Sequence, residues 1–324
     1  MRKLFIPIVL SSVLLMSACG SGEKNDAASP SASSAESSTA APSESPSASA
    51  TASSDTIIYQ SESGPVEVPA NPQRVVVLTR FLTGNVMILG VPLVGVDEMS
   101  KDNPNFAEQL KDAAVVSEDN PERILELNPD LIIADVDNKN LDKMKEIAPT
   151  VAYTYGKVDF KQQEIEIGKL LNKEKEARAW VEDFDARSKK AGEEIKAKIG
   201  ADATVSVIET FNKQLYVYGD NYGRGSEILY QQFGLKMPEK VLEGTKTAGY
   251  VALSTEVLGD YMGDYVIFSK DADQDNSFQD TATYKNLPSV KNGHVYEANE
   301  KAFYFNDPMS MEYQLEFFIQ HFLG

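Results

Sequence analysis

Two arginines of this chain stand where they could hold an oxygen-rich ligand. Arg224 lies between Gly223 and Gly225 after an expected strand, and the flanking glycines let the backbone come close to a bound molecule. An arginine side chain offers planar, paired donors that match carboxylate-like oxygens. Arg80, followed by Phe81, comes directly after an apolar strand, at the carboxyl end where a cleft would form. Arg80 has no acidic partner close in sequence, which favours a ligand role, although a solvated loop charge explains it equally well.

Aromatic side chains gather in two further segments. Residues 303–308 hold Phe-Tyr-Phe-Asn-Asp-Pro ahead of an expected helix, where Phe303 and Phe305 are best explained as a hydrophobic plug beneath that helix. Tyr153 and Tyr155 follow an expected strand and also reach its carboxyl end. Both segments could therefore line a cleft.

The motif content restricts catalysis and direct metal binding. The two histidines, His294 and His321, are too few for a zinc or manganese site, which needs clustered imidazole and acidic ligands. The sequence has no P-loop, no G-x-S-x-G and no H-E-x-x-H motif, and the glycines near Arg224 do not form G-x-G-x-x-G. We predict no catalytic residue, no direct metal ligand and no enzyme activity, with an extracellular hydrolase as the remote alternative.

The N-terminus resembles a bacterial lipoprotein signal. Arg2 and Lys3 precede an apolar run over residues 4–16 that is too short to span a membrane. The sequence Met-Ser-Ala-Cys at 16–19 then resembles a lipobox, with Met in place of the usual Leu. We predict a signal peptide at 1–18, a lipid on Cys19 and an extracytoplasmic membrane location, most in keeping with a Gram-positive cell. An ordinary secretory signal with an incidental cysteine is the alternative.

The segment after Cys19 predicts a tether. Residues 19–54 are almost entirely Ser, Ala, Pro and Thr, with nothing to bury in a core, and indicate a disordered linker. The formal charge of −18 becomes about −20 once Arg2 and Lys3 are removed with the signal. Such acidity argues against nucleic acid as a partner. We expect a monomer.

Hydrophobic periodicity predicts an α/β protein in two halves. Residues 56–60 and 66–68 indicate a hairpin, and a long amphipathic helix over 172–200 would join lobes at 55–171 and 201–324. A coiled-coil surface is the rival interpretation of that helix, but its apolar spacing is too irregular for heptads. We expect the ligand cleft between the lobes. The expected strands lie at 74–78, 93–96, 131–134, 204–208, 214–218, 265–268 and 293–296, and further helices at 83–89, 122–127, 226–233 and 309–322.

Six motifs carry a family resemblance that extends from residue 56 to the C-terminus. They are N-P-Q-R-V-V at 71–76, P-E-R-I-L-E-L-N-P-D-L-I-I at 121–133, I-A-P-T-V at 147–151, L-Y-V-Y-G-D-N-Y-G-R-G-S-E-I-L-Y at 215–230, G-L-K-M at 234–237 and N-D-P at 306–308. Together they resemble the iron–siderophore substrate-binding lipoproteins of bacterial ABC importers, in particular the Gram-positive ferric-hydroxamate binding proteins. The resemblance implies a class III periplasmic-binding-protein fold, in which one long helix bridges two Rossmann-like lobes and restricts them to small hinging.

The resemblance also implies a ligand and its contacts. The ligand would be an Fe(III)-siderophore, hydroxamate type favoured, and no intrinsic cofactor is expected. Arg224, Tyr216, Tyr222, Tyr304 and Tyr155 match binding-site positions of the family. Tyr222 and Tyr304 stand where relatives carry Trp, so the stacking surface is kept and the indole donor is lost.

The resemblance implies a second surface, for an ABC permease. Glu122 and Glu256 match the one carboxylate per lobe that docks on permease arginines, although a carboxylate at a helix start is also ordinary capping chemistry. A sibling binding protein for ferric citrate or a ferric catecholate is the alternative ligand class. Catecholates usually call for several basic pocket residues, and the aromatic set with one or two arginines favours hydroxamates.

Overall fold

The N-terminal hairpin opens the part of the chain that the structure describes. The computed structural model describes residues 55–324, so the predicted signal, the tether and Cys19 lie outside the described residues. The predicted hairpin is confirmed: β1 (Thr56–Ser61) pairs antiparallel with β2 (Gly64–Pro69). The buried side chains of Tyr59 and Val68 join the core of the first half.

The first half, residues 55–171, is built on a parallel sheet, and we call it the N-terminal lobe. The middle strands consist almost wholly of buried aliphatic residues, as expected for a sheet covered on both faces. Its five strands, in spatial order, are β5 (Ala114–Val115), β4 (Leu93–Val96), β3 (Val75–Val77), β6 (Leu131–Asp135) and β7 (Thr150–Tyr153).

Short helices connect these strands. Most begin at a side-chain cap, for example Asn120, whose side chain accepts from the Arg123 amide, and Asp159, which accepts from Gln162. They are α1 (Thr83–Ile88), α2 (Glu98–Asp102), α3 (Pro121–Glu126), α4 (Leu141–Ile147) and α5 (Phe160–Leu170).

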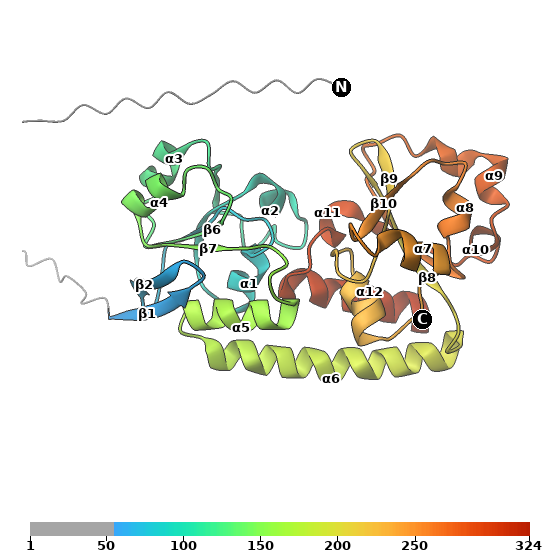
Figure 1. The fold of residues 1–324 in the computed structure, drawn as a ribbon, viewed down its shortest axis with the longest axis horizontal. Helices are drawn as coiled ribbons and strands as arrows, with labels where there is room; N and C mark the ends of the chain where they lie inside the picture. Colours follow the sequence, from blue (N-terminus) through green and yellow to red (C-terminus); the bar gives the residue numbers. More distant parts are fainter. Residues whose placement is uncertain (1–54) are drawn as a thin grey trace, which may run out of the picture. The chain divides into compact units, whose positions relative to one another are not determined.

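A single long helix, α6 (Glu174–Ile199), leads from the first half to the second (Figure 1). Its buried residues recur at helical spacing and include Ala177, Phe184 and Ile195. The helix packs against α5 of the N-terminal lobe and against α12 (Pro308–Leu323) of the second half. The expected helix between the two halves is therefore present, and both ends of it contribute to a core.

The second half, residues 201–324 or the C-terminal lobe, has a mixed sheet. Strand β9 runs against the other four strands, because it pairs antiparallel with both of its neighbours. The β8–β9 connection is a two-residue turn at Asn212 and Lys213, both with positive φ (48° and 64°), the geometry of a tight hairpin. The spatial order is β10 (Tyr250–Leu253), β9 (Gln214–Tyr218), β8 (Val205–Phe211), β11 (Tyr265–Lys270) and β12 (Val295–Asn299).

Helical segments surround this sheet. The helix expected at 226–233 is shorter and wider than predicted, because Glu227–Gln232 forms a π-helix, η1. The other segments are α7 (Glu239–Thr245), α8 (Leu258–Tyr261), the 3₁₀ turn η2 (Ser277–Asp280), α9 (Ala282–Lys285), α10 (Pro288–Lys291), α11 (Glu300–Phe303) and α12.

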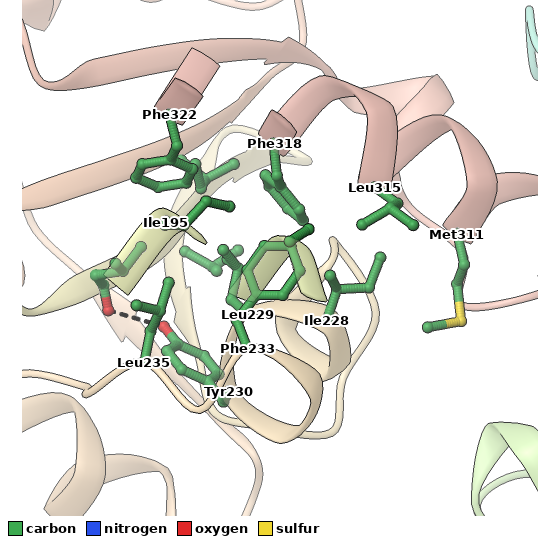
Figure 2. Close-up of a cluster of buried hydrophobic side chains, with 14 of the residues drawn as sticks. Ile195, Ile228, Leu229, Tyr230, Phe233, Leu235, Met311, Leu315, Phe318 and Phe322 are labelled. Carbon is green, nitrogen blue, oxygen red and sulfur yellow. Dashed lines mark hydrogen bonds between the residues drawn. The ribbon is translucent and has the colours of Figure 1, made fainter. Parts of the chain in front are cut away.

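The largest core cluster ties α6, η1 and α12 together. Figure 2 shows Ile195 from α6 beside Phe318 and Phe322 from α12, with side chains of η1 below them. In the same view the Tyr230 hydroxyl donates to the Val205 carbonyl oxygen (2.9 Å), so the tyrosine is buried with its polar end satisfied.

The two lobes share a seam of buried side chains. Phe106 of the N-terminal lobe and Phe305 of the C-terminal lobe stack with ring centroids 6.2 Å apart, and both are almost fully buried. Next to them, the Asn105 side-chain amide donates to the Ala302 carbonyl (3.1 Å). Gly84 lies so close to Asp307 that a Cβ at this position would overlap the carboxylate. The lobes are therefore packed directly on each other as well as joined by α6.

Candidate functional site

A strained turn holds Arg224 in place. Gly223, Arg224 and Gly225 all have positive φ (74°, 57° and 77°), which is accessible to glycine and costs an arginine on the order of 1 kcal/mol or more. A Cβ on Gly223 would lie 2.6 Å from the Tyr304 carbonyl oxygen, so the turn packs tightly under the 303–308 loop. The sequence predicted that these glycines would let the backbone approach a ligand. In the structure, Gly223 lets the backbone approach the 303–308 loop.

The Arg224 guanidinium forms a buried ion pair with Glu209. Nε lies 3.0 and 3.1 Å from the two Glu209 carboxylate oxygens, and Nη2 lies 2.9 Å from Oε2. The side chains are 5% and 0% exposed. Desolvation lowers the pKa of Arg224, but the Glu209 carboxylate outweighs it, and the net pKa is raised. Arg224 therefore stays charged in a nearly dry position.

Other groups complete the surroundings of Glu209. The Tyr218 hydroxyl (2.6 Å) and the Ser269 hydroxyl (3.1 Å) both donate to the Glu209 carboxylate. Glu300 lies nearby on α11, and burial, followed by the Glu209 charge, raises its pKa to about 7. Arg224 is thus surrounded by acidic and phenolic side chains. Sequence analysis did not single out Glu209 or Ser269, because neither stands in a recognisable motif.

Aromatic rings cover Arg224. The guanidinium carbon lies 3.9 Å from the centroid of the Tyr304 ring and 4.5 Å from that of Tyr218, within cation–π range. Tyr222 stacks on Tyr218 at 5.7 Å, and Tyr250 lies 5.3 Å from Tyr222. Of the two alternating tyrosines of β9, Tyr218 is the core residue and Tyr216 is partly exposed, next to Tyr250.

Tyr250 is a member of this cluster that sequence analysis missed. It opens β10 and pairs in register with Tyr218 of β9. The short strand Tyr250–Leu253 carries a β-type pattern, but its sequence gives no sign that it pairs with β9 and so brings Tyr250 to the other tyrosines.

The N-terminal lobe contributes Phe81 and Tyr155. Their rings lie 4.0 Å apart, and Phe81 is stacked against Tyr304 of the other lobe at 6.4 Å. Arg80 lies over the Phe81 ring at 5.4 Å, and its Nη1 donates to Met99 Sδ (2.9 Å). Arg80 is exposed. Burial raises the pKa of Asp97 and of Asp135, and the nearby charge of Arg80 opposes this shift, so the surroundings of Arg80 are more acidic than its sequence neighbours suggested.

These placements bring most of the predicted ligand-binding residues into one region. Tyr304 contacts both Arg224 and Phe81 and so connects the C-terminal set with the N-terminal set. Phe303 and Phe305 are fully buried, as expected for a plug, although Phe305 also contacts Phe81. Tyr153 is buried and donates to the Tyr59 hydroxyl (3.0 Å), which is a structural contact.

A cavity of about 50 Å³ adjoins these rings. Most of its wall comes from the N-terminal lobe, and Asn221 and Asn306 come from the C-terminal lobe. Tyr155 and Phe81 form part of this wall. Other residues of this wall include Thr79, Asn85, Asp135, Phe160 and Gln163.

The two predicted docking carboxylates are exposed and belong to different lobes. Glu122 is exposed in the first turn of α3, where Asn120 already caps the helix, so capping does not require the glutamate. Glu256 is exposed between β10 and α8, and the Ser254 hydroxyl lowers its pKa. Both carboxylates are therefore available to a partner, one on each lobe.

Residues 55–324 lack two other kinds of feature. Within this range no three His, Cys, Asp or Glu side chains cluster in a way that could hold a metal ion. In the same range, no helix combines the length and the apolar character needed to cross a membrane.

Comparison with known proteins decides the family. The model of the periplasmic binding protein family matches residues 75–302, most of the chain. The chain belongs to this family. The iron(3+)-hydroxamate-binding protein FhuD of Bacillus subtilis is 36% identical over 82% of this chain and 85% of its own length. The iron(3+)-hydroxamate-binding protein YxeB of the same organism is 32% identical over 80% of this chain and 82% of its own length.

Solved structures of family members show the same fold. The FhuD protein from S. pseudintermedius is 33% identical, with a TM-score of 0.75 over 83% of this chain and 99% of its own. FhuD2 from Staphylococcus aureus, solved with bound ferrioxamine B, is 32% identical, with a TM-score of 0.74 over 78% and 98%. The predicted α/β fold of two lobes and the predicted family are therefore confirmed.

Proposed function

We propose that this periplasmic binding protein captures an Fe(III)-siderophore, preferably a hydroxamate, and delivers it to the permease of an ABC importer. The observation that carries the proposal is the contact of Tyr304 with both Arg224 and Phe81, which gathers aromatic faces from both lobes around one buried cation. The hydroxamate ligands named for FhuD, YxeB and FhuD2 support the choice of ligand class.

The proposed mechanism is capture without chemistry. The iron of a ferric siderophore is already fully coordinated by the chelator, so the protein needs walls and a few donors and no metal ligands of its own. Arg224 donates from Nε and Nη2 to the Glu209 carboxylate and from Nη1 to the Tyr222 carbonyl oxygen (3.0 Å). The remaining N–H bonds of Nη1 and Nη2 are available for chelate oxygens. Tyr216, Tyr222, Tyr155 and Phe81 would supply the surrounding surface.

Delivery is the second part of the proposal. Glu122 and Glu256 would dock on basic residues of the permease, and Cys19 would carry the lipid that keeps the protein at the extracytoplasmic face of the membrane. Lipoproteins among the relatives, such as the probable siderophore-binding lipoprotein YfiY of Bacillus subtilis (28% identical), support the anchor. We propose a monomer acting in a Gram-positive envelope.

Calorimetric titration tests the ligand class. The chain from Gly20 onward, which lacks the signal and the lipidated cysteine, is titrated with ferrioxamine B, ferrichrome, ferric citrate and a ferric catecholate. We expect submicromolar binding of at least one hydroxamate and much weaker binding of the catecholate. Tight binding of the catecholate alone would refute the hydroxamate assignment, and binding of none of the four would refute the function.

A further inference from the structure

The cavity beside the aromatic rings lies where the sheet topology favours a ligand. In the N-terminal lobe, the chain runs from β3 outward to β4 on one side and then returns to place β6 on the other side of β3. Ligands of open α/β sheets bind at the carboxyl ends of the strands at such a switch point. Thr79 and Phe81 follow β3, Asp135 ends β6, and all three line the cavity.

The polar lining of this cavity includes the acceptors of Asp135 and Asn85, together with side chains that can also donate, such as Gln163, whose buried Nε2 has no partner among residues 55–324. Asp135 is a partly buried carboxylate, and burial raises its pKa against the lowering effects of Thr79 and Arg80, while Asp137 and Asp97 raise it further. Asn85 is 2% exposed, and its Oδ1 has no hydrogen-bond partner among residues 55–324. A buried acceptor without a partner is costly and is usually satisfied by a donor from water or a ligand.

Aromatic rings supply a large part of the apolar lining, beside Leu82 and Val158. The ring centroids of Phe81 and Tyr155 lie 4.0 Å apart, and Phe160 contributes from the start of α5. A carboxylate combined with aromatic faces is a favourable site for an alkylammonium group, which gains an ion pair and cation–π contacts together.

The size of the cavity limits what can enter. Its volume is about 50 Å³, more than the roughly 10–15 Å³ that one water molecule needs and far less than the roughly 300–1,000 Å³ of pockets that enclose a drug-sized ligand. The cavity can therefore take the end of a side arm but not a ferric chelate, which would stay outside, against the rings of Phe81 and Tyr304.

We propose that this cavity receives the terminal ammonium of an aminoalkyl arm carried by the hydroxamate siderophore, with Asp135 as its counter-ion. The proposal rests on the proposed function and narrows it to hydroxamates that carry a free amine. The arm would lie along Phe81 and Tyr155, and the ammonium would donate to the Asp135 carboxylate and to Asn85 Oδ1.

A ligand pair that differs only in the amine tests this. Ferrioxamine B and its N-acetylated derivative are titrated into the chain from Gly20 onward by calorimetry. We expect the free amine to bind at least about tenfold more tightly, because hydrogen bonds between charged groups are stronger than those between neutral groups. Equal affinities of the two ligands would overturn the proposal, whereas binding of neither would count against the proposed function instead.

Two variants locate the effect. Asp135→Asn keeps the shape of the side chain and removes its charge, so the preference for the free amine should disappear while the acetylated ligand binds as before. Asp137→Asn removes an exposed charge two residues away that does not line the cavity, and should keep the preference. Persistence of the preference in Asp135→Asn, with folding verified by circular dichroism, would overturn the assignment of the counter-ion. The wild-type ligand pair is decisive even if that variant fails to fold.

Discussion

Removing the Arg224 side chain should cost far more stability than removing an exposed arginine. In the variant Arg224→Ala, the fully buried Glu209 carboxylate loses all three of its guanidinium contacts and keeps the hydroxyls of Tyr218 and Ser269. Breaking a buried pair by deleting one partner costs about 3–5 kcal/mol, because a charge is left without compensation. Alanine also keeps the positive φ of this position, so the backbone strain is not released.

The assay is urea unfolding followed by circular dichroism at pH 7. The matched control is Arg178→Ala on α6, which breaks an ion pair with Glu174 whose side chains are 52% and 43% exposed. The free energy of unfolding of the control should fall by less than about 1 kcal/mol, the usual range for a surface ion pair. The double variant Arg224→Ala/Glu209→Gln removes the stranded charge, and we expect it to regain a large part of the loss. A loss below about 1 kcal/mol for Arg224→Ala would refute the reasoning from burial.

This series also separates stability from binding. If Arg224 donates to chelate oxygens, the refolded double variant should still bind the ferric hydroxamate at least tenfold more weakly than wild type. Wild-type affinity in a stably folded double variant would mean that Arg224 serves only the turn and the Glu209 pair.

Three further predictions follow from the site and its surroundings. Burial raises the pKa of Glu164 to about 9, so the folded protein keeps a proton on this carboxyl that the unfolded chain loses near pH 4.5. The free energy of unfolding should therefore fall by several kcal/mol between pH 5 and pH 9. In urea titrations, Glu164→Gln should flatten this pH dependence. Tyr304→Ala should weaken calorimetric binding about tenfold and Tyr304→Phe much less, because the ring and not the hydroxyl faces Arg224; equal losses would contradict this. Charge reversal at Glu122 or Glu256 should reduce siderophore uptake by cells without changing affinity, and unchanged uptake by the double reversal would remove them from docking.

The sequence predicted those parts of the fold whose pattern is local. The apolar runs that became β3 and β6 are buried on both faces, so their composition alone identifies them. The long helix α6 was visible because its buried positions recur at helical spacing over its whole length. The hairpin β1–β2 was indicated by Gly64 and Pro65, which directly follow its two-residue turn at Glu62 and Ser63.

The parts that the sequence did not predict depend on partners distant in the chain. β9 has the composition of any buried strand, and only the tight turn at Asn212 and Lys213 makes it antiparallel to β8. Tyr250 reaches the aromatic cluster because β10 pairs with β9. The role of Glu209 depends on the position of Arg224, 15 residues further on, and no local pattern specifies that contact.

The seam between the lobes also determines how often the lobes separate in the unliganded protein. Parting the lobes would expose Phe106 and Phe305, at about 1.5–3 kcal/mol for each side chain. Their sum of roughly 3–6 kcal/mol corresponds to an open population between about one molecule in a hundred and one in several tens of thousands. A biosensor built on this protein would therefore gain little signal from dyes that report the distance between the lobes. A fluorophore placed beside the Phe81 and Tyr304 rings would report occupancy directly.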